Sequence, residues 1–169
     1  EILRAFDVIT FVAESPSLVA SFHGTDYATG IFQEAEKEGI PLELCSGSKG
    51  ALGSYLLGQS PEPDLILSTS HPCDSTASIY QYISYITGVP SFVLDSPYWD
   101  DKESYDYYEK NYWGMVRFLE KQLNQKIDWD RLKKVCETVN STNYYLTELT
   151  ELGRAVPSPM GIMMLLIAW

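Results

Sequence analysis

Short apolar runs alternate with amphipathic stretches over the N-terminal part of the chain. Four runs have the aliphatic and β-branched composition of buried strands: residues 8–13 (VITFVA), 42–45 (LELC), 64–69 (DLILST) and 90–95 (PSFVLD). The stretches between them have helical spacing, as where Tyr27, Ile31 and Ala35 share one face, and Gly88 is expected to end a helix over residues 75–87. Alternating strands and helices are typical of α/β proteins with right-handed crossovers. The pattern predicts a parallel sheet of about four strands, Rossmann-like or flavodoxin-like, with flanking helices.

The pattern changes after residue 98. Apolar side chains then recur every three or four positions over two long stretches, separated by a short break at residues 124–128. This spacing predicts a helical pair, with Asp128 as the N-cap of the second helix. Residues 157–159 (PSP) are expected to end the pair, and the apolar run 160–169 (MGIMMLLIAW) to begin a further element. A bilayer-spanning helix takes about 20 residues, so this run is too short to span, and we expect the sequence to be a segment of a longer polypeptide.

Acidic residues outnumber basic residues by 23 to 12, which gives a formal charge of -11. Such an excess repels phosphate backbones and anionic lipid, so nucleic acid and membrane surfaces are poor partners. The hydrophobic share of 45% is that of a globular protein rather than a disordered one. The residues before position 8 form no cationic leader, so we expect no signal peptide and predict a cytoplasmic location.

The three cysteines fall in two kinds of position. An odd count without secretory signals favours a reducing compartment over a disulfide scaffold. Cys45 and Cys73 each lie where a predicted strand ends and a helix begins, so a parallel sheet can bring them to one edge. Helix N-termini favour the thiolate, the form that binds metal, while two small buried apolar side chains are an equally good interpretation. Cys136 lies on the apolar stripe of a long helix and is predicted to pack in the core.

Several stretches together resemble one protein family. A cysteine before a glycine-bearing helix is followed by a PEPDL segment, a strand and a Cys-Asp pair, an arrangement more specific than any of its parts. The matching stretches are residues 1–15 (EILRAFDVITFVAES), 44–75, 88–98 (GVPSFVLDSPY) and, more loosely, 117–134. On these residues the sequence resembles the D-component of 2-hydroxyacyl-CoA dehydratases (2-hydroxyglutaryl-CoA dehydratase-like), a family that also includes benzoyl-CoA reductase subunits.

The resemblance implies a cofactor and a domain division. The cofactor is a low-potential 4Fe–4S iron–sulfur cluster held by three cysteines of one subunit. Cys45 and Cys73 match the first two ligand positions, and the third ligand belongs to a second α/β domain. By the same resemblance, residues 1–98 form an N-terminal α/β domain, and residues 99–169 form a helical connector and the start of the second α/β domain, most of which lies outside this segment.

The resemblance also implies partners and a reaction. An ATP-dependent iron–sulfur activator passes an electron to the cluster and on to an acyl-CoA substrate, which is bound by a heterodimer with a homologous second subunit. In the dehydratases a radical mechanism then eliminates water from the 2-hydroxyacyl group, whereas in the reductases an aromatic acyl ring is reduced. A non-catalytic electron-transfer or scaffold member of the family is a further interpretation.

Other positions carry a functional interpretation beside a simpler one. His71 lies two residues before Cys73 and is suited to move a proton or to tune the cluster, while a loop histidine that caps a helix or faces solvent is the simpler interpretation. The glycines of the run 47–53 (GSKGALG) lack the spacing of nucleotide-binding loops, which leaves close approach to a cluster or to a neighbouring helix. Lys49 is either a contact for a CoA phosphate or a solvated lysine.

Residues 95–113 are dense in acidic and aromatic side chains. That density suits a subunit interface or a binding groove, whereas an amphipathic helix with a tyrosine-rich core face explains it without a partner. The sequence has no Ser-His-Asp order, paired-carboxylate signature or HExxH motif, so a hydrolase has little support.

Overall fold

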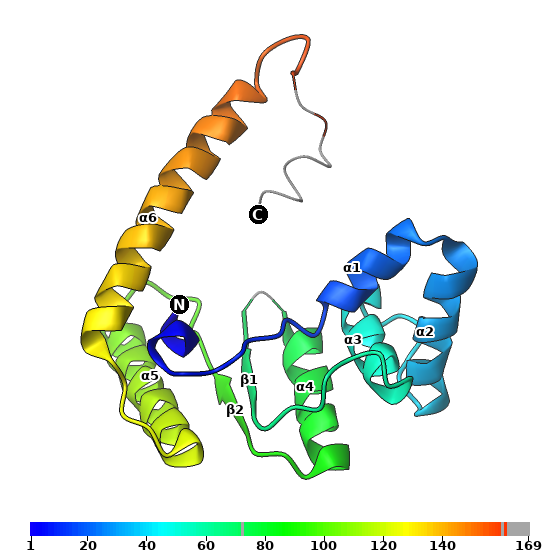
Figure 1. The fold of residues 1–169 in the computed structure, drawn as a ribbon, viewed down its shortest axis with the longest axis horizontal. Coiled ribbons are helices and arrows are strands. Elements are labelled where there is room, and N and C mark those ends of the chain that lie inside the picture. Colours follow the sequence, from blue (N-terminus) through cyan, green and yellow to red (C-terminus); the bar gives the residue numbers. More distant parts are fainter. Residues whose placement is uncertain (72, 160, 162–169) are drawn as a thin grey trace. The chain divides into compact units, whose positions relative to one another are not determined.

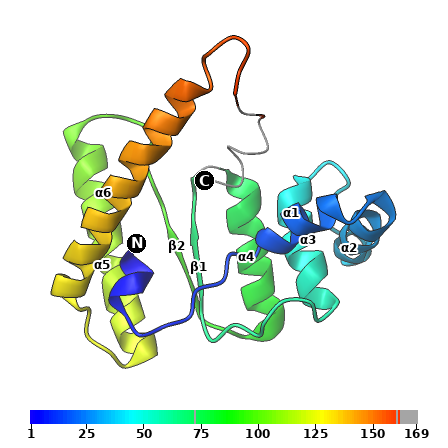
Figure 2. The ribbon, with the colours of Figure 1, turned by 45° about the horizontal axis from the view of Figure 1, so that its top comes forward.

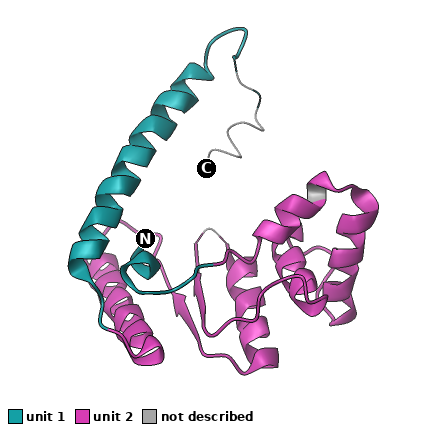
Figure 3. Cartoon of the chain, in the orientation of Figure 1, with its two compact units in different colours: residues 1–10, 126–169 teal, residues 11–125 magenta. Residues whose placement is uncertain are grey.

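A computed structural model describes residues 1–71, 73–159 and 161 of the chain. The elements found in those residues are η1 (a 3-10 helix, Ile2–Ala5), α1 (Ser15–Phe22), α2 (Thr25–Lys37), α3 (Ser46–Leu56), β1 (Ile66–Thr69), α4 (Asp74–Thr87), β2 (Ser91–Leu94), α5 (Lys102–Leu123) and α6 (Trp129–Leu152) (Figure 1). By their contacts, residues 11–125 form one compact unit, and residues 1–10 with 126–169 form the other (Figure 3). The division after residue 98 stays a prediction.

Strands β1 and β2 lie side by side as a parallel pair, and α4 is the connection between them (Figure 2). The register pairs Ile66 with Ser91 and Thr69 with Leu94. Helix α4 packs on both strands, and α5 packs on β2. Parallel strands point their carboxyl ends the same way, so the segments that follow them leave the sheet at one edge. The predicted α/β fold with a parallel sheet is confirmed in this coarse form, although most of the described residues are helical.

The sheet has two strands within the described residues, not about four as predicted from the sequence. Residues 8–13 run as irregular chain into a turn, with the Ile9 side chain fully exposed. Residues 42–45 form a turn, in which the Leu44 N–H donates to the Pro41 carbonyl at 3.1 Å. Both runs have the composition of a strand, but a strand also needs a neighbour whose N–H and C=O groups face its own. Neither run has such a neighbour in the described part of the chain.

Helices α1, α2 and α3 pack on one another, and two glycines of α3 lie where it contacts α1 and α2. A Cβ atom on Gly50 would lie 2.0 Å from Oγ of Ser17, and one on Gly53 would lie 1.9 Å from the Ile31 carbonyl oxygen. A side chain at either position would push the neighbouring helix away, so these glycines serve close helix approach, one of the two predicted uses. Helix α1 begins at Ser15 with Pro16 in its first turn, where the fixed φ of proline suits the helix.

One core cluster of the 11–125 unit lies between α2, α3, α4 and β1. Its buried members are Ala35, Ala51, Leu52, Ile66, Ile79 and Ile83. Leu52 has no exposed surface and Ile79 is 2% exposed. Because these side chains come from α3, α4 and β1, their packing fixes where the amino ends of α3 and α4 lie relative to the strand.

Both long helices predicted after residue 98 are present, as α5 and α6, and an aspartate stands just before each of them. Asp101 accepts a hydrogen bond from the Ser104 N–H, and Asp128 accepts one from the Arg131 N–H, each at 2.8 Å. The cap predicted at Asp128 is therefore confirmed.

Cys136 on α6 is exposed, so its predicted place in a core is wrong. None of the residues 129–152, all of which the structure describes, is buried. Helical spacing identifies the side chains that share a face, but it does not show whether another element covers that face. The run 160–169 lies outside the described residues except for Gly161. No helix in the described part of the chain combines the length and the apolar character that crossing a membrane requires.

Candidate functional site

Two of the three cysteines occupy the residue just before an α-helix. Cys45 is the N-cap of α3 and Cys73 is the N-cap of α4. Cys73 follows a strand closely, as predicted, whereas Cys45 follows a turn. The first N–H groups of a helix have no partner within it and leave partial positive charge at that end. Both cysteines therefore lie at positively polarised helix ends.

The first turns of α3 and α4 meet through two serine hydroxyls. Oγ of Ser48 lies 3.2 Å from Oγ of Ser75. Ser48 is three residues after Cys45, and Ser75 is two residues after Cys73. The two helix ends that carry the cysteines therefore adjoin, which is the arrangement a shared ligand would require.

The Cys73 thiol is surrounded by hydroxyl groups. Its Sγ lies 3.1 Å from Oγ of Ser75 and 3.5 Å from Oγ1 of Thr76. Hydrogen bonds from Ser75 and then from Thr76 stabilise the thiolate and lower the pKa of Cys73 to about 7, against a smaller opposing effect of burial. The lowered pKa makes the thiolate of Cys73 easier to form near neutral pH, which suits a metal ligand or a nucleophile.

The described residues supply part of a metal site. Thiolates at Cys45 and Cys73 are donors of the kind that zinc ions and iron–sulfur clusters take. In the part of the chain that the structure describes, no three His, Cys, Asp or Glu side chains gather closely enough to hold a metal ion. A complete site would need further ligands from elsewhere.

Lys49 lies three residues into α3, and its side chain is 7% exposed. Its Nζ donates to Oε1 of Glu36 at 2.7 Å and to the Leu42 carbonyl oxygen at 2.8 Å. Neither sequence interpretation holds, because this lysine is not solvated and its charge is already paired. The ion pair links Lys49 to helix α2, and the hydrogen bond to Leu42 links it to the turn before Cys45. Lys49 therefore helps to position that cysteine.

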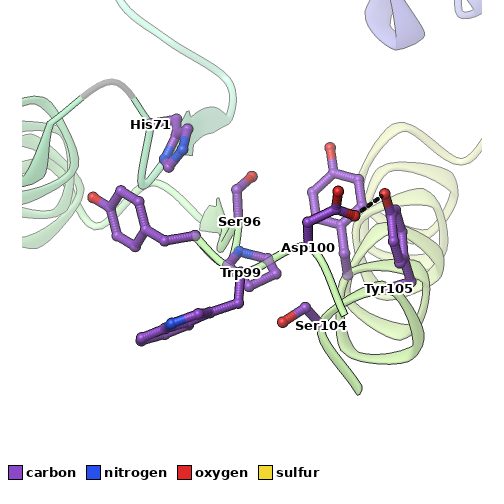
Figure 4. Close-up of a pocket in the computed structure, with 9 residues that line it drawn as sticks. His71, Ser96, Trp99, Asp100, Ser104 and Tyr105 are labelled. Carbon is purple, nitrogen blue, oxygen red and sulfur yellow. Dashed lines mark hydrogen bonds between the residues drawn. The ribbon is translucent and has the colours of Figure 1, made fainter. Parts of the chain in front are cut away.

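A second feature, a pocket of about 310 Å³, lies at the carboxyl edge of the two strands (Figure 4). The side chains that Figure 4 labels around it are His71, Ser96, Trp99, Asp100, Ser104 and Tyr105. His71 is exposed, and its ring centroid lies 4.8 Å from that of Tyr98, with the planes tilted by 45°. The structure thus places His71 in a pocket wall, on the same loop after β1 that carries Cys73.

One carboxylate ties the ends of the two strands to α5. Oδ2 of Asp95 accepts from the Tyr107 hydroxyl at 2.7 Å, and the Ser70 hydroxyl also hydrogen-bonds to this carboxylate. The Ser96 N–H donates to Oγ of Ser70 at 2.9 Å. The hydrogen bond from Tyr107 and then that from Ser70 lower the pKa of Asp95, and the electrostatic influence of His71 acts in the same direction. Asp95 therefore holds the start of the loop that leads to His71.

Ser48, Ser75 and Asp95 are site residues that sequence reasoning missed. The available signal was positional: each lies within a few residues of a cysteine N-cap or of the carboxyl end of a strand. Residues at those places line ligand sites in open parallel sheets. Which serine meets which, however, depends on helix packing that a single sequence does not encode.

The fold and the site define an α/β protein with cysteines at two adjoining helix N-termini and an aromatic pocket at the carboxyl edge of its sheet. Comparison with known proteins then identifies the family. Residues 1–169 match the model of the family described as 2-hydroxyglutaryl-CoA dehydratase, D-component, and the chain belongs to this family. The resemblance stated from the sequence is confirmed.

One curated relative is the lactoyl-CoA dehydratase subunit alpha of Anaerotignum propionicum. It is 19% identical over an alignment of 157 positions, and the match covers 79% of this chain and 37% of the relative. The chain thus spans well under half the length of this relative.

Proposed function

We propose that the chain is part of the iron–sulfur subunit of a 2-hydroxyacyl-CoA dehydratase, a lyase that eliminates water from a CoA thioester. The observation that carries the proposal is the pair of cysteine N-caps on α3 and α4, whose first turns are joined by the hydroxyls of Ser48 and Ser75. Membership of a dehydratase-component family supports the reaction class.

Cys45 and Cys73 are the proposed protein ligands of a 4Fe–4S cluster within this chain. The fit rests on donor chemistry: two sulfurs lie at positively polarised helix ends, and hydroxyls stabilise the Cys73 thiolate. A third thiolate comes from outside the described residues. When bound, such a cluster supplies a low-potential electron and an iron atom able to accept an oxygen ligand. An ATP-dependent activator, a homologous second subunit and a cytoplasmic location complete the proposal.

The chain's own residues have three roles in this scheme. Ser75 and Thr76 hydrogen-bond to the Cys73 sulfur, and such bonds tune the potential of iron–sulfur sites. His71, in the pocket wall, is the proposed group that takes or gives a proton at its imidazole. Asp95 orients the loop that leads to His71.

A benzoyl-CoA reductase type of reaction is the second candidate. It is favoured by the aromatic side chains Tyr98, Trp99 and Tyr105, which line the pocket beside His71. Such a pocket accommodates an aromatic acyl group, which is the substrate of that reaction.

The intact enzyme tests the proposal after anaerobic purification. We expect iron and acid-labile sulfide in equal amounts, and elimination of water from a 2-hydroxyacyl-CoA when ATP and the activator are added. Ring reduction of an aromatic acyl-CoA without dehydration would select the second candidate. A preparation free of iron and sulfide would contradict the cluster assignment under both.

A further inference from the structure

The pocket at the sheet edge is bordered by large aromatic side chains that the chain leaves uncovered. Tyr98 is 74% exposed, Trp99 73% and Tyr105 65%. Apolar surface gathered around a concave site is a mark of ligand binding, because its burial by a ligand is favourable. A volume of about 310 Å³ lies at the lower end of the range of small-molecule pockets.

The charge around the pocket disfavours an anionic ligand group. Asp100 is a lining residue, and no lysine or arginine is among the described lining residues. Oδ1 of Asp100 accepts from the Tyr105 hydroxyl at 2.7 Å, which keeps the carboxylate in the wall. Hydrogen bonds also lower the pKa of neighbouring Asp95, so its negative charge persists at neutral pH.

The amino end of α5, which borders the pocket, is already occupied. Asp101 accepts from the Ser104 N–H at 2.8 Å and so places its own carboxylate at this helix end. Lys102, the first residue of the helix, pairs with Asp106. The groups that would attract a substrate carboxylate at this end are therefore engaged with carboxylates of the chain itself.

We propose that this pocket binds the acyl side chain of the CoA thioester and selects side chains without a terminal carboxylate, with an aromatic ring as the best match. The inference rests on the proposed function, because it takes the ligand to be a 2-hydroxyacyl-CoA. The pocket lies on the loop that carries Cys73, and His71 in its wall is two residues away along the chain. Stacking against Tyr98 and Trp99 would hold the ring, and Asp100 would repel a second carboxylate.

Equilibrium binding to the intact enzyme, without activator or reductant, tests this selectivity. The probes are 2-hydroxy-3-phenylpropanoyl-CoA and 2-hydroxyglutaryl-CoA, titrated by calorimetry. We expect the phenyl probe to bind about tenfold tighter or more. Tyr98→Ala should weaken its binding by up to about tenfold, whereas Tyr85→Ala, on an 82% exposed tyrosine of α4 outside the pocket, should leave it unchanged. Asp100→Asn should strengthen binding of 2-hydroxyglutaryl-CoA alone.

Three results would overturn the inference: tighter binding of 2-hydroxyglutaryl-CoA, equal effects of Tyr98→Ala and Tyr85→Ala, or no binding of either thioester. Iron content is measured on the same preparations. If the selectivity appears in a protein without iron, the cluster proposal fails and the pocket assignment stands. If iron is present and the selectivity is absent, the pocket assignment fails and the cluster proposal stands.

Discussion

Oγ of Ser48 and Oγ of Ser75 lie 3.2 Å apart and join the first turns of two helices that begin after cysteines. The contact links residues 27 positions apart in the sequence. It brings together the helix ends that carry Cys45 and Cys73, and Ser75 also hydrogen-bonds to the Cys73 sulfur.

Removing the Ser75 hydroxyl should make Cys73 less acidic. Its hydrogen bond is the largest cause of the lowered pKa of about 7, and a thiol that loses a donor to its thiolate regains a higher pKa. In cluster-free protein at pH 7, Ser75→Ala should slow alkylation of Cys73 by roughly 3- to 10-fold, and the pH midpoint of the reaction should rise.

Ser78→Ala is the control for that experiment. Ser78 lies on the same helix, and its hydroxyl donates to the Asp74 carbonyl oxygen at 2.8 Å rather than to the thiol. If Ser75→Ala and Ser78→Ala shift the alkylation profile equally, the Ser75 hydrogen bond is not the cause of the lowered Cys73 pKa.

The Asp95 carboxyl should titrate below its usual range, and Tyr107 should be the main reason. The folded-state pKa is depressed, so this carboxylate favours the folded form above its unfolded pKa, and the benefit is lost as the pH falls through the folded pKa. Tyr107→Phe removes the 2.7 Å hydrogen bond and should raise the pKa of Asp95 toward the ordinary aspartate value of 3.8. NMR titration of the carboxyl carbon checks this, with Tyr144→Phe on α6 as the control. No change in Tyr107→Phe would disprove the attribution.

A methyl group at Gly53 should destabilise the packing of α2 against α3. The added Cβ would lie 1.9 Å from the Ile31 carbonyl oxygen, so backbone must move. We expect a loss of about 2–4 kcal/mol in the free energy of unfolding, measured in urea. Gly30→Ala is the matched control, because a Cβ there meets nothing within 4 Å in the middle of α2. Gly30→Ala should raise the free energy of unfolding by about 0.5–1 kcal/mol. Equal effects of Gly53→Ala and Gly30→Ala would contradict the close packing of α3 on α2.

Breaking the Lys49 ion pair should cost more than breaking an exposed one. Lys49→Ala leaves the Glu36 carboxylate, 23% exposed, without its cation, and we expect a loss of about 1–3 kcal/mol. Lys37→Ala removes the exposed partner of Glu34 and should cost less than about 0.5 kcal/mol. Urea unfolding of both variants measures the two losses in the free energy of unfolding. Equal costs would mean that the Lys49 pair contributes no more than a surface contact.

Local signals in the sequence were sufficient for most helices and for the two strands that pair. Gly88 takes a left-handed conformation at φ 72° and ends α4 at the predicted place, because glycine adopts that conformation without steric cost. Asp128 caps α6 as predicted, through its own side chain. These features depend on a few neighbouring residues, which a single sequence contains in full.

Features that depend on distant partners were beyond the sequence. Residues 8–13 have the composition of a buried strand, yet Ile9 is fully exposed, because no described strand lies beside it. Cys136 has the spacing of a core position, yet the side chain is exposed. The cysteine N-caps were visible as candidates, but the Ser48 to Ser75 contact arises from how α3 packs on α4.

The most direct test of the central claim is the iron content of three single variants of the intact enzyme, Cys45→Ala, Cys73→Ala and Cys136→Ala, purified anaerobically. Cys136 is the internal control, because it is an exposed thiol within α6 rather than at a helix cap. We expect Cys45→Ala and Cys73→Ala each to lose most of their iron and acid-labile sulfide, while Cys136→Ala retains both. Full retention of iron in Cys45→Ala and Cys73→Ala, or equal loss in all three variants, would contradict it.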